Sequence, residues 1–392
     1  MKTESIISRE SSVLAQTYAR YPVELVSGQG AVCEDGTGKQ FIDMTSGIGV
    51  NALGFCDPGW VRAVSDQMTK IQHACNLFYT RPMVELAEAL TNRTHFKRVF
   101  FGNSGAEANE GVIKAARKYG FDNYGKERTT IITLENSFHG RTITTLAATG
   151  QDVFHNYFFP FTEGFKFVPA NDLDAMLSAM DETVCAVMIE LVQGEGGVVP
   201  LEQDYVAALS TECAKRDILL IVDEVQTGIG RTGTLFSYEQ FGIEPDIISS
   251  AKGLGAGLPI GAVLLGEKVQ DTLGAGLHGT TFGGNPMACA GAVYVLECMD
   301  EAFLEDVIKK GEHTRKRLLG MPHVQNVSGL GLMIGITLDI DVKPIVAECI
   351  HRGLLVLTAK QKLRLLPPLN IDQAVLEEGL NRLEEALKGA TL

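Results

Sequence analysis

Lys252 lies in an unusual place for a lysine, between an apolar run and a glycine-rich turn within residues 247–262. A free lysine has a pKa of about 10.4 and is a poor nucleophile at neutral pH, whereas desolvation or a nearby cation lowers that pKa. The position favours a lysine that forms a Schiff base with an aldehyde cofactor. The alternative is a lysine that extends along apolar surface beside the turn, although the neighbouring serines and glycines offer little such surface.

Asp223 ends the most apolar run of the chain, residues 218–222. A carboxylate at the end of a buried strand is costly unless it is paired. The protonated nitrogen of a pyridine ring would be a suitable partner. A structural aspartate bonded to a neighbouring loop, or a metal ligand, are alternatives that Asp223 alone does not exclude.

Residues 103–110 follow a strand-like run and open a helical pattern. Small residues at the start of a helix, here Ser104, Gly105 and Ala106, let backbone N–H groups approach an anion such as phosphate, and the helix dipole favours the anion. An ordinary helix start capped by Ser104 is the alternative.

The elements that position these residues follow one another in a regular order. Apolar runs predict buried strands, and helical patterns at 107–119 and 203–215 lie between some of them. The predicted strands are residues 98–101, 130–134, 185–191, 218–222, 246–249 and 260–265. Such alternation indicates an α/β fold with a mostly parallel sheet covered by helices. Ligands bind at the carboxyl ends of such strands, where Asp223 and Lys252 lie.

The two ends of the chain have a different pattern. Residues 23–43 read as short strands joined by tight turns, and residues after Pro286 alternate between helical and strand-like segments. We therefore expect a smaller α/β domain in residues 287–392. The N-terminal segment, residues 1–50, is expected to pack with it, and residues 51–286 to form the large domain.

The bulk composition excludes some functions. A formal net charge of −14 without basic clusters argues against a nucleic-acid-binding protein. The 8 cysteines form no C-x-x-C pair and suggest a reduced, cytoplasmic protein. The sequence predicts no metal site, signal peptide or membrane span.

Several longer motifs occur in register with these residues. They are Asn51-Ala-Leu-Gly54, Asn76-Leu-Phe-Tyr79, Ser137-Phe-His-Gly-Arg-Thr142, Gln193-Gly-Glu-Gly-Gly197 and Thr281-Phe-Gly-Gly-Asn-Pro286. With them, the chain resembles the class III (subgroup II) aminotransferases, which use pyridoxal 5′-phosphate and have fold type I. The resemblance extends from Val23 to Pro368 and is greatest to the members that act on N-acetylornithine.

The resemblance implies a set of cofactor-binding residues. Lys252 would hold pyridoxal phosphate and act as general base and acid. Asp223 would pair with the pyridine nitrogen, and Gln226 would bond the ring oxygen. Phe138 and Val225 would cover the two faces of the ring, although ordinary core packing is an alternative for Phe138.

The resemblance also implies a phosphate site that two subunits share. Ser104, Gly105 and Ala106 would bind the phosphate, with Ala106 standing where the family often has threonine. Thr281 would reach the phosphate held by the other subunit, so the resemblance predicts a homodimer.

For the substrates, the resemblance implies two arginines. Arg141 would hold the substrate α-carboxylate, because a planar fork suits a bidentate carboxylate. Arg364 would receive the other carboxylate of 2-oxoglutarate or glutamate, and Glu195 would pair with Arg364 when the amino donor is bound. A permanent Glu195–Arg364 ion pair is the alternative. Glu190 would be a further active-site carboxylate, and Thr280 would contact substrate from the partner subunit.

The implied activity is transfer of the amino group of N-acetylornithine to 2-oxoglutarate, giving N-acetylglutamate 5-semialdehyde and glutamate, in arginine biosynthesis. Alternative donors are ornithine, succinylornithine, succinyldiaminopimelate, 4-aminobutyrate and a lysine-pathway intermediate. A related enzyme that racemises or shifts amino groups, and a non-catalytic protein that binds pyridoxal phosphate, are further alternatives. Leu191 departs from a proline usual in the family, and residues 55–58 depart from a histidine-rich pattern.

Overall fold

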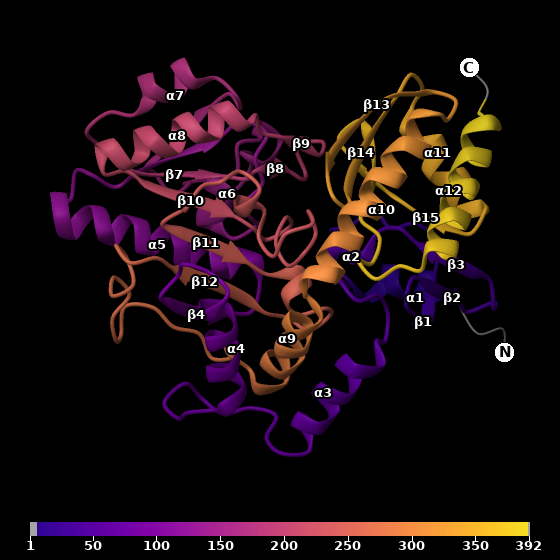
Figure 1. The fold of residues 1–392 in the computed structure, drawn as a ribbon, viewed down its shortest axis with the longest axis horizontal. Coiled ribbons are helices and arrows are strands. Elements are labelled where there is room, and N and C mark those ends of the chain that lie inside the picture. Colours follow the sequence, from indigo (N-terminus) through magenta and orange to yellow (C-terminus); the bar gives the residue numbers. More distant parts are fainter. Residues whose placement is uncertain (1–5, 391–392) are drawn as a thin grey trace.

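The structure, a computed structural model, describes residues 6–390. The ends of the two predicted terminal ranges, residues 1–5 and 391–392, lie outside the described residues. Figure 1 shows a larger part built on a seven-stranded sheet beside a smaller part built on two four-stranded sheets. No helix within the described range is long and apolar enough to cross a membrane.

The large sheet has the strand order β4-β12-β11-β10-β7-β5-β6. In that order the strands are β4 (Arg98–Gly102), β12 (Gly261–Leu265), β11 (Ile247–Ser250), β10 (Leu219–Asp223), β7 (Val184–Ile189), β5 (Thr130–Leu134) and β6 (Phe165–Val168). Only β12 runs against its neighbours, pairing antiparallel with β11 and β4. The remaining pairs are parallel. The predicted mostly parallel α/β sheet is confirmed.

Helices cover both faces of this sheet. They include α5 (Gly105–Tyr124), α6 (Ile143–Ala148), α7 (Leu173–Ala179) and α8 (Gln203–Arg216). Along β10, Leu220 and Val222 belong to the same apolar cluster as Leu209 of α8. Ile221 points the other way, into the cluster that contains Val112 of α5. Successive residues of a strand face opposite sides, and because both sides are apolar the strand reads as a continuous hydrophobic run.

The smaller part joins the two ends of the chain. One of its sheets has the order β13-β14-β17-β16 and the other the order β1-β2-β3-β15. Their strands are β13 (Val324–Leu330), β14 (Met333–Leu338), β17 (Lys362–Leu365), β16 (Leu357–Ala359), β1 (Leu25–Gln29), β2 (Val32–Asp35), β3 (Gln40–Asp43) and β15 (Leu354–Leu355). Leu354 pairs with Ile42 in parallel register. N-terminal strands therefore share a sheet with a strand from near the C-terminus.

The remaining elements connect or cover these sheets. They are α1 (Ile6–Val13), α2 (Ser46–Gly49), α3 (Pro58–Met68), α4 (Arg81–Asn92), η1 (Asp152–Phe154), β8 (Val192–Gln193), β9 (Val199–Pro200), η2 (Ser237–Glu239), η3 (Lys252–Leu254), α9 (Pro286–Cys298), α10 (Glu301–Leu319), α11 (Val342–His351) and α12 (Gln373–Lys388). Helix α9 packs against α3 and α4 of the preceding segment. The domain boundaries at residues 50 and 286 stay predictions.

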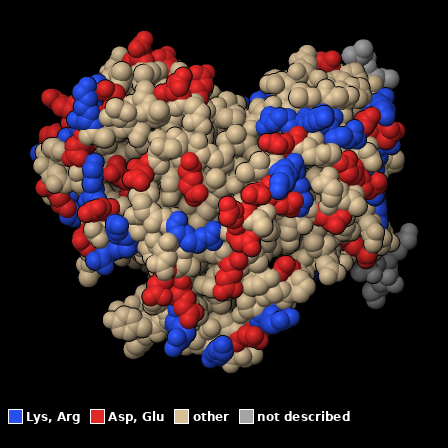
Figure 2. All heavy atoms as spheres, in the orientation of Figure 1, with Lys and Arg blue, Asp and Glu red and all other residues tan. Residues whose placement is uncertain are grey.

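The charged side chains on the face drawn in Figure 2 are mixed in sign. Lys and Arg are interspersed with Asp and Glu, and no broad basic surface is visible from this side. A protein that binds the nucleic-acid backbone needs clustered basic groups facing the phosphates. This face therefore offers no such surface.

Candidate active site

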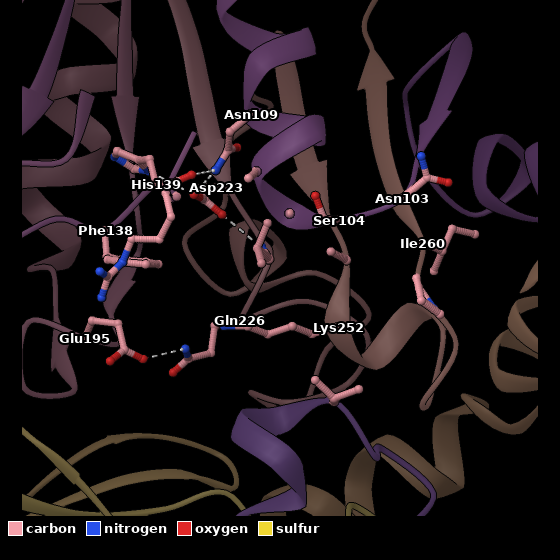
Figure 3. Close-up of a pocket in the computed structure, with 18 of the residues that line it drawn as sticks. Asn103, Ser104, Asn109, Phe138, His139, Glu195, Asp223, Gln226, Lys252 and Ile260 are labelled. Atoms are coloured by element: carbon pink, nitrogen blue, oxygen red, sulfur yellow. Dashed lines mark hydrogen bonds and ion pairs between the residues drawn. The ribbon is translucent and has the colours of Figure 1, made fainter. Parts of the chain in front are cut away.

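A cavity of about 480 Å³ opens at the carboxyl ends of β7, β10 and β11. Figure 3 shows Phe138, Asp223, Ser104, Gln226 and Lys252 grouped around one space. The predicted site residues that line this cavity are Ser104, Gly105, Ala106, Phe138, Arg141, Glu190, Glu195, Asp223, Val225, Gln226 and Lys252. Residues from widely separated segments thus meet where the sheet topology places a ligand.

Lys252 begins η3, directly after β11, and lines the cavity instead of lying along the outer surface. Its pKa is lowered to about 8, mainly by burial; the carboxylate of Glu195 raises it, and the nearby cation Arg364 lowers it. Its backbone has a φ of 46°, in the left-handed region that residues with a side chain seldom adopt. Strain of this kind is found at functional sites where the surrounding fold enforces it.

Asp223 is 4% exposed and accepts three hydrogen bonds. The backbone N–H of Val225 donates to its Oδ1 at 3.0 Å, and Asn109 Nδ2 donates to its Oδ2 at 2.7 Å. His139 Nδ1 lies 2.8 Å from the same Oδ2. Burial would lower the pKa of His139, but the hydrogen bond and charge of Asp223 outweigh burial and raise that pKa. His139 is therefore positioned to hold a proton against the carboxylate.

Asn109 and His139 are site residues that the sequence interpretation missed. Asn109 lies on α5, downstream of the predicted phosphate-binding residues, and also donates to the backbone carbonyl of His139 at 2.8 Å. His139 lies inside the motif that carries Phe138 and Arg141. Among the described residues no group of three or more His, Cys, Asp or Glu side chains is placed to hold a metal ion.

The start of α5 faces the cavity through Ser104, Gly105 and Ala106. Ser104 caps the helix, and its Oγ accepts a hydrogen bond from Glu107 N at 3.1 Å. The first backbone N–H groups of a helix lack acceptors within it and can bind an anion. A Cβ at Gly105 would lie 2.7 Å from Cγ1 of Val225, so only glycine allows this close approach. Capping by Ser104 is observed, and phosphate binding stays a prediction.

Phe138 is half-buried and lines the cavity instead of filling the apolar core. Its backbone N–H donates to Glu190 Oε2 at 3.0 Å, and Gly194 N donates to Glu190 Oε1 at 3.3 Å. Burial raises the pKa of Glu190 to about 7. Glu190 thus joins the segment that carries Phe138 to the segment that carries Glu195.

Arg364 enters from β17 of the smaller part and is 2% exposed. Its Nη1 donates to Glu195 Oε1 at 2.5 Å and to Gln226 Oε1 at 3.4 Å. Figure 3 marks the contact of 3.5 Å between Gln226 Nε2 and Glu195 Oε1. Burial would raise the pKa of Glu195, but the charge and hydrogen bond of Arg364 outweigh burial and lower it. The ion pair is formed in this structure, while its opening for a dicarboxylate stays a prediction.

Arg141 has a different environment from Arg364. It is exposed, and among residues 6–390 no carboxylate forms an ion pair with it. Its guanidinium lies over the rings of Phe154 and Phe138, at 4.2 Å and 5.6 Å from the ring centroids. The cavity therefore has one neutralised and one unpaired arginine.

Thr280 and Thr281 do not line this cavity. Thr280 Oγ1 accepts a hydrogen bond from Asn103 Nδ2 at 2.9 Å, and Thr281 is exposed. Their contacts with the other subunit stay predictions.

Comparison with known proteins identifies the family. Residues 13–387 match the model of the family described as aminotransferase class-III. This chain belongs to the class III aminotransferases. The acetylornithine aminotransferase of Haemophilus ducreyi is 53% identical to this aminotransferase over 99% of both chains.

Solved structures agree with the family assignment. The N-acetylornithine aminotransferase of Stenotrophomonas maltophilia has a TM-score of 0.84 and 36% identity, with 98% of each chain covered. The ornithine aminotransferase of Toxoplasma gondii has a TM-score of 0.93 and 30% identity, covering 99% of this aminotransferase and 96% of that chain. The predicted fold and family are confirmed.

Class III aminotransferases use pyridoxal 5′-phosphate and take an amino donor and a keto-acid acceptor. The cavity of this aminotransferase fits that cofactor chemically. Lys252 has a lowered pKa, which favours attack on an aldehyde. Asp223 offers a buried carboxylate for a ring nitrogen, and the start of α5 offers backbone N–H groups for a phosphate.

Proposed function

We propose that this aminotransferase transfers the amino group of N-acetylornithine to 2-oxoglutarate, within arginine biosynthesis. The observation that carries the proposal is the unequal state of the two arginines, because Arg364 is neutralised by Glu195 whereas Arg141 is unpaired. A donor with one free carboxylate needs one available cation, and a dicarboxylate acceptor needs two. The 53% identity to the Haemophilus ducreyi enzyme supports the same donor.

In this proposal Lys252 anchors the cofactor and then moves a proton. When bound, pyridoxal phosphate supplies an electron sink that stabilises negative charge at the carbon bearing the amino group. Lys252 Nζ would remove the proton from that carbon as general base and would give it back as general acid. Its lowered pKa supports this role, because the neutral amine is accessible near neutral pH.

Several other residues orient the cofactor. Asp223 holds the ring nitrogen in its protonated form, and the hydrogen bonds from Asn109 and His139 support this by keeping the carboxylate in place. Gln226 bonds the ring oxygen, while Phe138 and Val225 cover the faces of the ring. Ser104, Gly105 and Ala106 bind the phosphate at the start of α5.

The two arginines divide the substrate contacts. Arg141 holds the α-carboxylate of N-acetylornithine through the free N–H edge of its guanidinium. Glu195 stays on Arg364 while this donor is bound and moves away when 2-oxoglutarate brings its second carboxylate. Such a switch lets one cavity accept two substrates of different charge. Glu190 positions the backbone beside Phe138.

We also propose a cytoplasmic homodimer, in which Thr281 reaches the phosphate and Thr280 the substrate of the partner. Large exposed apolar side chains support a dimer, because a second copy of the chain would cover an apolar surface that is normally not left exposed to water. Leu77, Phe78 and Tyr79 are 89%, 68% and 98% exposed. These residues belong to one of the motifs that suggested the family.

Other donors are kept as alternatives. Ornithine has a specific observation in its favour, the TM-score of 0.93 to the Toxoplasma gondii ornithine aminotransferase. The identity of 30% to that protein is lower than the 53% identity to the acetylornithine aminotransferase. The further donors are succinylornithine, succinyldiaminopimelate and 4-aminobutyrate. A non-catalytic role is disfavoured because Lys252 and Asp223 are both present in the cavity.

The decisive experiment follows the first half-reaction with each donor separately. The absorbance of the bound cofactor is recorded after adding acetylornithine, succinylornithine, ornithine, 4-aminobutyrate or glutamate. We expect the largest kcat/KM among the ω-amino donors for acetylornithine, with glutamate also active as the reverse donor. A larger value for ornithine or 4-aminobutyrate would reject the proposed donor while leaving the family intact.

A further inference from the structure

Phe154 lies in contact with two residues of the proposed site. The Arg141 guanidinium carbon lies 4.2 Å from the centroid of the Phe154 ring and above it. The rings of Phe154 and Phe138 also meet in a T-shaped contact, with the ring centroids 6.0 Å apart and an interplanar angle of 69°. Phe154 therefore connects the ring that lines the cavity to the unpaired arginine.

The backbone around Phe154 is fixed by hydrogen bonds to the site. Phe154 ends η1, and its N–H donates to Gln151 O at 3.0 Å. Gln151 Nε2 in turn donates to the carbonyl of Ser137 at 3.0 Å, next to Phe138. His155 Nε2 lies 3.1 Å from the carbonyl of Leu146 in α6. These hydrogen bonds fix the backbone on both sides of Phe154 and thereby hold its ring against Arg141.

Stacking on an aromatic ring does not compete with binding of a carboxylate. A guanidinium stacks through its flat face, whereas a carboxylate binds in the plane of its N–H groups. Without such a contact, an exposed arginine loses rotamer freedom each time a substrate binds. A ring that already holds the guanidinium removes part of that cost.

We propose that Phe154 is a positioning residue for substrate binding, which holds the Arg141 guanidinium so that its N–H edge is presented to the substrate carboxylate. The inference rests on the proposed function, because it requires Arg141 to be the carboxylate site. It predicts that Phe154 affects every substrate that Arg141 binds, donor and acceptor alike, mainly through KM.

The test compares Phe154→Leu, Phe154→Tyr and Phe161→Leu in the enzyme loaded with cofactor. Phe161 serves as the matched control, because it lies in the same segment and packs on His155, away from Arg141. KM and kcat are measured for N-acetylornithine and 2-oxoglutarate, and the dissociation constant of pyridoxal phosphate is measured by absorbance titration.

We expect Phe154→Leu to raise both KM values by about 2- to 30-fold, the range of a cation–π contact. The kcat values and the cofactor dissociation constant should change little. Phe154→Tyr keeps an aromatic face and should stay close to the wild-type enzyme, as should Phe161→Leu.

Three outcomes would overturn the inference. One is unchanged KM values in Phe154→Leu while Arg141→Ala raises them, which leaves the proposed function intact. Another is an equal rise in KM for Phe161→Leu, which would assign the effect to folding of the segment. The third is a loss of kcat and of cofactor affinity in Phe154→Leu at constant KM, which would mean that Phe154 acts through its contact with Phe138 and not through Arg141. If Arg141→Ala itself left both KM values unchanged, the proposed role of Arg141 would fail first.

Discussion

The reactivity of Lys252 depends on the fraction of its amine that is neutral. Burial is the main cause that lowers its pKa to about 8, and the charge of Arg364 contributes to the same decrease. Because only the neutral amine attacks an aldehyde, capture of pyridoxal phosphate by the cofactor-free protein should accelerate as pH rises through about 8 and level off above that. An exposed lysine would have its midpoint at about 10.4. Stopped-flow absorbance between pH 6 and 10 measures the profile.

The variant Glu195→Gln tests whether a neighbouring charge helps to set the pKa of Lys252. The Glu195 carboxylate raises the pKa of Lys252 by stabilising its ammonium form. Removing that charge should move the midpoint of the capture rate to lower pH. A midpoint that moves upward, or a wild-type midpoint near that of an exposed lysine, would show that the amine is solvated and not buried.

The hydrogen bonds that Asn109 and His139 make to Asp223 should contribute to the free energy of unfolding. Asn109→Leu removes a donor at 2.7 Å from a buried carboxylate, which should lower the free energy of unfolding by about 1–3 kcal/mol. Asn123→Leu is the control, because Asn123 lies on the same helix and donates to Tyr119 O at an exposed position. Thermal unfolding of the cofactor-free protein measures both. Equal shifts for the two variants would contradict a special role of Asn109.

The site residues differ in how far the sequence revealed them. Asp223 and Lys252 were predictable because each follows an apolar run, where a charge is conspicuous. Asn109 and His139 were not, because their partner Asp223 lies 114 and 84 residues away along the chain. Those contacts exist only after the sheet has brought α5 and β10 together, and no local pattern records them.

At the scale of elements, the strands that are buried along their whole length were predictable from their apolar runs, whereas β6 and the β8–β9 pair were not. Strands β7, β10 and β12 are buried throughout and read as continuous apolar runs. Strand β6 lies at the edge of the sheet and is only partly buried, with Lys166 in its middle, so it lacks that signal. The short β8–β9 pair was also missed, because two residues per strand are too few to show a period.

The ion pair between Glu195, in the loop between β8 and β9, and Arg364 of β17 predicts different effects for the two arginines. Arg364→Ala removes a buried partner of Glu195, and we expect it to raise KM for 2-oxoglutarate by about 30-fold or more. The KM for N-acetylornithine should change much less. Arg141→Ala should weaken both substrates. Steady-state kinetics with each substrate varied in turn distinguishes them, and an equal loss for both substrates in Arg364→Ala would favour a permanent ion pair.

At the scale of the whole molecule, the isolated chain leaves apolar surface uncovered. Tyr79 and Tyr157 are 98% and 92% exposed, and Leu77 is 89% exposed. The formal charge of −14 favours solubility but does not cover these side chains. Thr281 is exposed and lies outside the cavity of its own chain, which agrees with a contact to the phosphate bound by a second subunit. The proposed dimer explains both features.

Mixing two inactive variants tests whether the sites are shared. Lys252→Ala removes the anchor, and Thr281→Glu should prevent phosphate binding by placing a carboxylate beside it. In a hybrid dimer with shared sites, one site combines both defects, whereas the other combines an intact Lys252 with an intact Thr281. Unfolding and refolding the two variants together should therefore restore activity, up to about one working site per hybrid. Each variant refolded alone is the control and should stay inactive. If Thr281 acts within its own subunit, both sites of the hybrid carry a defect, and the mixture should remain as inactive as its parents.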